Sequence, residues 1–144
     1  NKTDEELLLL KENNGVIGLS SWGPLCWRNN IEKGRPSLAD YVDHIDYVVN
    51  LIGIDHVGFG SDSTPDDTKD EKGVVTQSTL YGGVVADYNK YVGTNPDERY
   101  AIHADGPWDL EYIFDEMRKR GYSEEDIRKY AGGNFMRVFK DNWK

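Results

Sequence analysis

Hydrophobic residues recur at the spacing of one helical face between residues 38 and 52. The positions that share this face are Leu38, Tyr41, Val42, Ile45, Val48, Val49 and Ile52. A stripe of this width is typical of a helix that packs on a core. Ser37 precedes the stripe as an N-cap with Asp40 three residues later, and Gly53 follows it. The pattern predicts a helix that is closed at Gly53.

Four further helical segments are predicted mainly from the residues that begin or end them. Candidate helix starts are the capping box Thr3–Glu6, Pro107 at a first turn, and Ser123 as an N-cap. Candidate stops are residues 13–15, Gly121, and the Gly132-Gly133-Asn134 break. After that break, the spacing of the apolar residues predicts a last helical segment that carries Phe135, Val138 and Phe139.

Two short apolar runs, residues 15–20 and 56–60, indicate buried β-strands. The second run is apolar on both faces, which suits a parallel strand covered by helices on one side and a barrel core on the other. Residues 63–105 are irregular, with a short helix predicted within residues 80–91. A connection of this length inside a compact domain is uncommon and usually functional or partly helical.

The alternation of helices and strands indicates parallel β/α units and an α/β fold. Two strands are too few for a stable parallel sheet, and a parallel barrel takes eight strands in roughly 250 residues. Two strand edges would also be left unpaired. We therefore expect residues 1–144 to form a single segment, the C-terminal portion of a (β/α)8 TIM-type barrel that is incomplete in this chain. The other strands would come from the same protein or from a docked partner.

Composition excludes several function classes. The net charge of −9 argues against nucleic-acid partners and anionic membrane surfaces, which attract Lys and Arg. Cys26 is the lone cysteine, so neither an internal disulfide framework nor a cysteine zinc cluster is available. No apolar run approaches the roughly 20 residues of a membrane segment. The sequence leaves the oligomeric state open, including a homodimer.

Asp62 is the strongest candidate for chemistry, because it follows the second apolar run and its glycines, Gly58 and Gly60. Barrel enzymes keep their catalytic groups at the C-terminal ends of strands. The pattern alone equally allows Asp62 to cap the turn at residues 63–65. Trp22 follows the first strand, so it is expected at the same end. Trp22 either lines a substrate pocket or anchors a buried loop.

The three histidines are interpreted as structural, so no metal ligand is assigned within this chain. His44 is expected on a solvated or ion-paired helix face, and His56 begins the second strand, away from its C-terminal end. His103 lies in a loop beside an aspartate, and no second ligand follows at metal-like spacing. Asn134 and Arg137 are expected to act as a helix cap and a surface ion partner.

Six short segments carry a family resemblance through their order and spacing: Thr3-Asp4-Glu5-Glu6-Leu7, Gly15-Val16-Ile17-Gly18, Asp43-His44-Ile45-Asp46, residues 54–62, residues 120–127, and residues 132–139. Together they resemble the C-terminal part of the membrane (renal) dipeptidases, a family of zinc metallopeptidases. The resemblance implies a (β/α)8 barrel with two zinc ions that cleaves dipeptides. It also implies that the metal ligands lie upstream of Asn1, so none can be assigned here.

The resemblance assigns Asp62 to the family's catalytic aspartate. We expect a zinc-dependent dipeptidase whose activity needs the remaining barrel segment of the same protein, so that residues 1–144 alone are inactive. Two alternatives stay open. The segment could belong to a non-catalytic barrel relative that acts as an interaction module, or to another amidohydrolase-like hydrolase that acts on a non-peptide amide.

Overall fold

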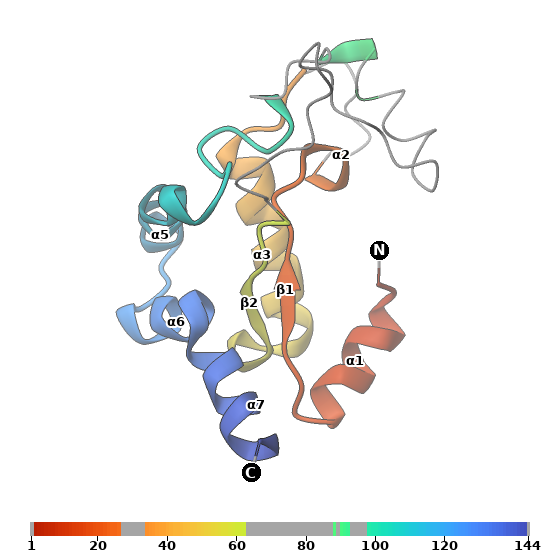
Figure 1. The fold of residues 1–144 in the computed structure, drawn as a ribbon, viewed down its shortest axis with the longest axis vertical. Helices are drawn as coiled ribbons and strands as arrows, with labels where there is room; N and C mark the ends of the chain where they lie inside the picture. The colour runs from red at the N-terminus through yellow and green to blue at the C-terminus, as the bar shows by residue number, and fades with distance from the viewer. Residues whose placement is uncertain (1, 27–33, 63–87, 89, 93–97, 144) are drawn as a thin grey trace.

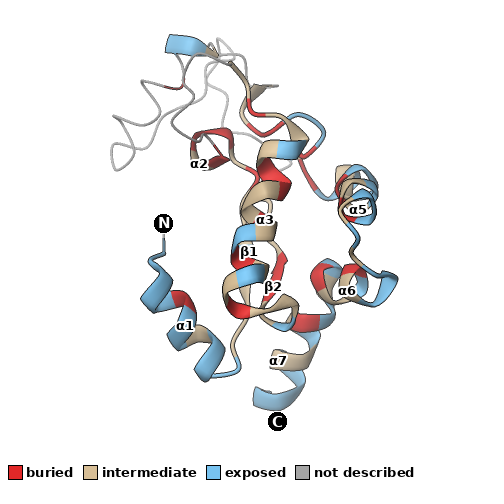
Figure 2. Cartoon of the chain, turned by 180° about the vertical axis from the view of Figure 1, so that it is seen from behind, coloured by how far each residue is buried: buried red, intermediate tan, exposed pale blue. Residues whose placement is uncertain are grey.

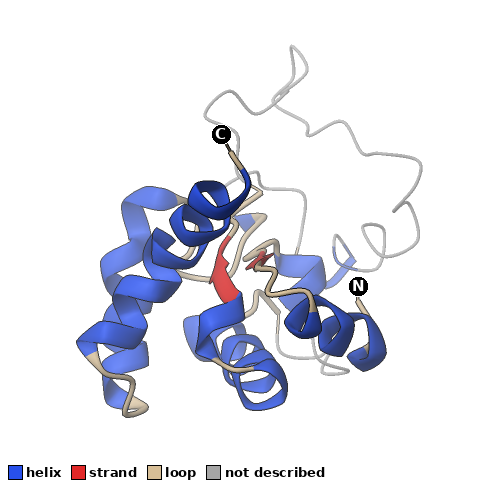
Figure 3. Ribbon diagram, turned by 90° about the horizontal axis from the view of Figure 1, so that it is seen from below, coloured by secondary structure: helices blue, strands red, loops and turns tan. Residues whose placement is uncertain are grey.

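The computed structural model describes residues 2–26, 34–62, 88, 90–92 and 98–143. Two parallel strands, β1 (Ile17–Leu19) and β2 (Val57–Phe59), lie side by side at its centre (Figure 1). Ile17 pairs with Val57, and Leu19 pairs with Phe59. Because the strands are parallel and in register, their carboxyl ends emerge together at one end of the molecule. Viewed along the strands, the helices surround this pair (Figure 3).

The helix α3 (Leu38–Ile52) makes the crossover from β1 to β2, as the apolar stripe predicted. Its capping box is formed by Ser37 and Asp40, and Gly53 ends it with a φ of 92° that favours glycine. The residues on its buried face are Tyr41, Val42, Ile45, Val48 and Ile52. They form the centre of the core, and Figure 2 shows buried and exposed positions alternating along α3.

The helix α1 (Asp4–Glu12) begins at the predicted capping box and packs against α3. The Thr3 side chain accepts a hydrogen bond from the Glu6 amide, and Glu6 accepts one from the Thr3 amide. Among the described residues, no helix has the length and apolar content to cross a bilayer.

The strands are shorter than predicted. Residues 15–20 and 56–60 each contribute three strand residues, and His56 lies in a 3₁₀ turn, Ile54–His56, instead of the strand. β2 is mostly buried, but Gly18 of β1 is exposed. Of the helix predicted within residues 80–91, only Tyr88, Lys90 and Tyr91 are described, and they are helical; the rest lies outside the described residues.

The helices that follow residue 106 lead back from the carboxyl end of the strands toward their amino end (Figure 1). A 3₁₀ turn (Pro107–Asp109) leads into α5 (Leu110–Lys119), which ends before Gly121 as predicted. Ser123 caps α6 (Glu124–Arg128), which continues through a π-helical turn (Lys129–Gly133) into α7 (Asn134–Asn142). The predicted break is therefore a kink at Gly132, whose φ is 155°.

Asn134 holds this kink against β2, and its role differs from the predicted helix cap. Its side chain is 3% exposed and donates hydrogen bonds to the carbonyls of Ile54 and Val57, at 2.7 and 2.8 Å. These two carbonyls flank the turn that enters β2. One buried amide therefore joins the C-terminal helices to the second strand.

Arg120 joins the C-terminal helices to α3. Its Nη1 lies 2.7 Å from an Asp43 carboxylate oxygen and 2.6 Å from one of Asp46. The Tyr122 hydroxyl also donates to Asp46, at 2.7 Å. The guanidinium is largely covered, so this cluster is less screened by solvent than an exposed ion pair. The cluster around Arg120 therefore fixes which side of α3 packs against α5.

Replacing Asn134 by alanine should lower the free energy of unfolding by about 1–3 kcal/mol, because one buried and one partly buried carbonyl lose their donor. The midpoint of urea unfolding measures this. Asn142→Ala is the matched control, since its exposed amide donates to a carbonyl within its own helix and should change stability by at most about 0.5 kcal/mol. Equal midpoints for the two variants would contradict the anchoring role.

Candidate active site

The carboxyl ends of β1 and β2 form one mouth, at the upper end of the strands in Figure 1. Residues 20–22 leave β1 there, and residues 60–62 leave β2. Residues 99–105 run across these two loops, as their hydrogen bonds show below. The mouth therefore brings together three segments that are far apart in the sequence.

Hydrogen bonds fasten residues 99–104 to the loop after β1. The Ser21 hydroxyl, fully buried, donates to the Ala104 carbonyl at 2.6 Å. The Ala101 amide donates to the Ser21 carbonyl at 2.9 Å, and the Gly23 amide donates to the Arg99 carbonyl at 2.7 Å. These contacts explain why a polar serine is buried here.

Asp62 lies at the mouth with its side chain exposed, as predicted from its place after the second strand. Its φ of 59° is in the left-handed region, where residues other than glycine are uncommon. Its carbonyl accepts a hydrogen bond from the Tyr100 hydroxyl at 2.8 Å. The turn at residues 63–65 that Asp62 could cap lies outside the described residues.

Trp22 is half-buried at the same mouth, where its backbone pairs with Tyr100 in an antiparallel bridge. Its amide donates to the Ser20 hydroxyl at 3.1 Å. Tyr100 thus contacts both predicted site residues, Trp22 through the backbone and Asp62 through its hydroxyl. Sequence reasoning did not identify Tyr100, because no motif marks a tyrosine 38 residues from its partner.

Arg35 and Asp105 form a second contact that the sequence did not indicate. Arg35 Nη2 lies 2.7 Å from the Asp105 carboxylate. The Nε of Arg35 donates to the Tyr100 carbonyl, also at 2.7 Å. Burial raises the pKa of Asp105, and the Arg35 charge acts in the opposite direction. The pair ties residues 100–105 to the segment that enters α3.

Cys26 lies beneath the mouth, 1% exposed, with its thiol 3.7 Å from the Ser20 carbonyl. Burial raises the pKa of this thiol to about 12, and the Asp40 charge acts in the same direction. The thiolate is the reactive form of cysteine. Cys26 is therefore a core residue and not a nucleophile at neutral pH.

The histidines do not assemble a metal site. His56 Nδ1 lies 2.8 Å from the Gly15 carbonyl, and His103 is exposed with its ring stacked on Tyr112. The prediction for His44 is wrong, because its Nε2 is buried and has no hydrogen-bond partner within the part of the chain that the structure describes. His44 lies three residues after Tyr41 and four before Val48, so it borders the buried helix face. In the described ranges, no three His, Cys, Asp or Glu side chains could hold a metal together.

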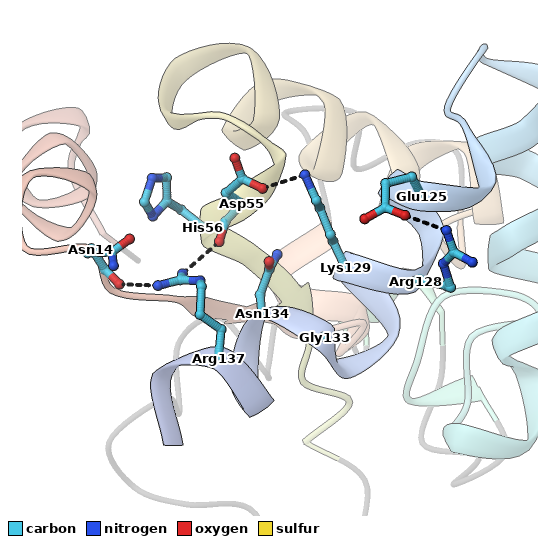
Figure 4. Close-up of a pocket in the computed structure, with 9 residues that line it drawn as sticks. All are labelled: Asn14, Asp55, His56, Glu125, Arg128, Lys129, Gly133, Asn134 and Arg137. Atoms are coloured by element: carbon cyan, nitrogen blue, oxygen red, sulfur yellow. Dashed lines mark hydrogen bonds and ion pairs between the residues drawn. The ribbon is translucent and has the colours of Figure 1, made fainter. Parts of the chain in front are cut away.

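A hollow of about 460 Å³ lies at the opposite end, beside the turn that enters β2 (Figure 4). Arg137, expected to pair with a charge, instead donates to the carbonyls of Asn14 and Asp55, both at 2.9 Å. Lys129 pairs with the Asp55 carboxylate at 2.6 Å, and a further ion pair joins Arg128 to Glu125. The amino-terminal end of a barrel is associated with stability, so these contacts fit a structural role.

Comparison with known proteins agrees with this architecture. The family model described as "Membrane dipeptidase (Peptidase family M19)" matches residues 1–76. The "Dipeptidase aclJ" of Aspergillus oryzae is 33% identical over 98% of this chain, which covers 26% of that protein. The chain spans about a quarter to two fifths of the length of the curated relatives it matches.

Solved structures show the same fold at low identity. A metallopeptidase structure described as "dipeptidase AC", of family M19, superposes with a TM-score of 0.68 at 20% identity, covering 99% of this chain and 33% of that one. A Rhodobacter sphaeroides metallopeptidase, bound to a phosphinate mimic of the dipeptide L-Ala-D-Ala, gives a TM-score of 0.60 at 21% identity, covering 99% and 32%. The chain therefore has the fold of the C-terminal part of a dipeptidase barrel.

The Cys26 thiol should resist alkylation in the folded protein at pH 8 and react at once in denaturant. Mass spectrometry of the peptide that contains Cys26 measures this. Because burial raises the pKa of the Cys26 thiol, folding favours its neutral form. The stability contributed by the neutral thiol is complete below the unfolded pKa of about 8.5, and it is lost as the pH rises toward the folded pKa of about 12. Rapid labelling of the folded protein at pH 8 would contradict the burial.

Proposed function

The chain belongs to the membrane dipeptidase family, and on this premise we propose that the complete protein is a zinc-dependent dipeptidase whose proton transfer is carried by Asp62. The observation that supports the proposal most directly is the exposed Asp62 carboxylate at the carboxyl end of β2. A relative named as a dipeptidase and a neighbour bound to a dipeptide mimic favour dipeptides as the substrate class.

Asp62 would act as a general base and then as a general acid. Its carboxylate takes a proton from the attacking water as the water oxygen bonds to the peptide carbonyl carbon. It returns that proton to the amide nitrogen as the C–N bond breaks, leaving an amine and a carboxylic acid, which releases the second water proton to solvent and becomes a carboxylate. Such positioned proton transfer contributes typically 10²–10⁴-fold to a rate. Trp22, half-buried at the same mouth, is proposed to contact the substrate.

We propose that the metal is held by other parts of the protein. The described residues do not fit a zinc site, since no cluster of metal-ligating side chains occurs among them. The structure neighbour described as a metallopeptidase favours a metal-dependent enzyme. We therefore assign the ligands of two zinc ions to the remaining barrel segment and derive no step through the metal from this chain.

The remaining barrel segment is also required for the proposed activity on structural grounds. β1 and β2 form a two-stranded parallel sheet, and an isolated pair of strands is marginally stable. We propose that residues 1–144 form one unit of the last β/α elements, completed by the other strands of the same protein. The alternative of a non-catalytic relative is tested by assaying the unsubstituted full-length protein, and the role of Asp62 is tested by substitution.

In the full-length protein, Asp62→Asn should lower kcat for dipeptide hydrolysis by about 10²–10⁴ with zinc content retained, because the amide cannot accept the proton. Steady-state kinetics and metal analysis measure both quantities. Asp141→Asn, an exposed aspartate on α7, is the matched control and should keep full activity. Unchanged turnover of Asp62→Asn would overturn the proposed role of Asp62, and absence of turnover in the unsubstituted full-length protein would favour the interaction module.

Removing the metal from the full-length protein with a chelator should abolish hydrolysis, and added zinc should restore it. Residues 1–144 produced alone should show no turnover at any zinc concentration, since no metal ligand is assigned to them. The measurement is release of free amino acids from a dipeptide. Robust dipeptide cleavage by residues 1–144 alone would contradict the proposal that the metal ligands lie in the remaining barrel segment.

A further inference from the structure

Tyr100 lies at the junction of the three segments that form the mouth. Its side chain is 5% exposed, and its hydroxyl donates to the Asp62 carbonyl at 2.8 Å. Its backbone pairs with Trp22, and its carbonyl accepts from Arg35 Nε at 2.7 Å. One buried residue therefore connects the end of β1, the end of β2 and the segment that enters α3.

The two peptide groups that flank the Asp62 α-carbon are both held by side-chain hydroxyls. The Ser20 hydroxyl donates to the Ser61 carbonyl at 3.5 Å, a long contact, and the Tyr100 hydroxyl donates to the Asp62 carbonyl. The orientation of these two peptide planes fixes the backbone dihedral angles of Asp62. Those angles set the direction in which the side chain leaves the backbone.

Asp62 needs this support more than an ordinary loop residue does. Its φ of 59° is sparsely populated for a residue with a β-carbon, and such conformations persist only where surrounding contacts enforce them. The carboxylate itself is exposed. The contacts that enforce its position therefore act on the backbone, and the shorter of the two comes from Tyr100.

We propose that Tyr100 is a positioning residue for Asp62: its hydroxyl holds the backbone of Asp62 so that the carboxylate faces the substrate. The proposal rests on the proposed function, because it assumes that Asp62 transfers a proton. Proton transfer requires the carboxylate within hydrogen-bond reach of the reacting group. A base held by its surroundings keeps that geometry, and a base on an unrestrained loop does not.

The surroundings of Tyr100 are suited to this role. Arg35 binds both the Tyr100 carbonyl and the Asp105 carboxylate, and the buried Ser21 binds residues 101 and 104. The phenol is therefore attached to a segment that is fastened on both sides of it. Loss of the hydroxyl alone should free Asp62 and leave the rest of the segment in place.

Tyr100→Phe in the full-length zinc-loaded enzyme tests the proposal, since it removes the hydroxyl and keeps the buried ring. We expect kcat to fall about tenfold, which is the usual scale for one hydrogen bond, with KM, zinc content and melting temperature retained. Tyr47→Phe is the matched control. Its exposed hydroxyl donates to Asp4 at 2.7 Å, in the contact between α1 and α3, and its loss should leave kcat unchanged.

A double-mutant cycle separates positioning from general support of the loop. If Tyr100 acts through Asp62, Tyr100→Phe should cause no further loss of kcat in the Asp62→Asn background. Full wild-type kcat in Tyr100→Phe would overturn the proposal. So would equal losses in the two backgrounds, or a loss explained by lower zinc content or melting temperature.

The outcomes for the two proposals are distinguishable. If Asp62→Asn retains full turnover, the proposed function fails and the positioning role fails with it. If Asp62→Asn is impaired and Tyr100→Phe is fully active, only the positioning role fails. A tenfold loss in Tyr100→Phe that disappears in the Asp62→Asn background supports both.

Discussion

The in-register parallel pairing of β1 and β2 is the interaction on which the rest of the structure depends. It aligns the carboxyl ends of the two strands, so that the loops bearing Trp22 and Asp62 begin side by side. The pairing requires the two strand backbones to lie close together toward their carboxyl ends. A β-carbon on Gly18 would lie 3.2 Å from the Gly60 α-carbon. A larger residue at Gly18 would therefore push apart the two loops that form the mouth.

The two ends of the strand pair have different physical characters. At the amino end, Asn134 and Arg137 donate to main-chain carbonyls, and charged side chains pair with one another. At the carboxyl end, Asp62 is exposed and its backbone is strained, while buried contacts hold the segments around it. The amino end therefore carries structural contacts alone, while the carboxyl end also presents an exposed aspartate, a division that parallel barrels generally show.

Local sequence rules predicted the elements well and their contacts poorly. The capping boxes at Thr3, Ser37 and Ser123 form as predicted, because each depends on residues within one helical turn. Arg137 was expected to find a carboxylate and instead binds carbonyls. His44 was expected on a solvated or ion-paired helix face, yet its Nε2 is buried. Both errors concern surroundings that only tertiary packing creates.

The sequence by itself determined most of the helices, the two strands and the place of Asp62 at a strand end, because periodicity and capping are local properties. It did not indicate the short helix α2 (Gly23–Cys26) in the loop after β1. The incomplete barrel was inferred from the small number of strands and from the family resemblance. Only the tertiary structure decided what holds that aspartate. Tyr100 is 38 residues from Asp62, and Arg35 is 70 residues from Asp105. Hydrogen bonds over such separations leave no pattern in a single sequence, since they form only after the strands and α3 have fixed both partners in space.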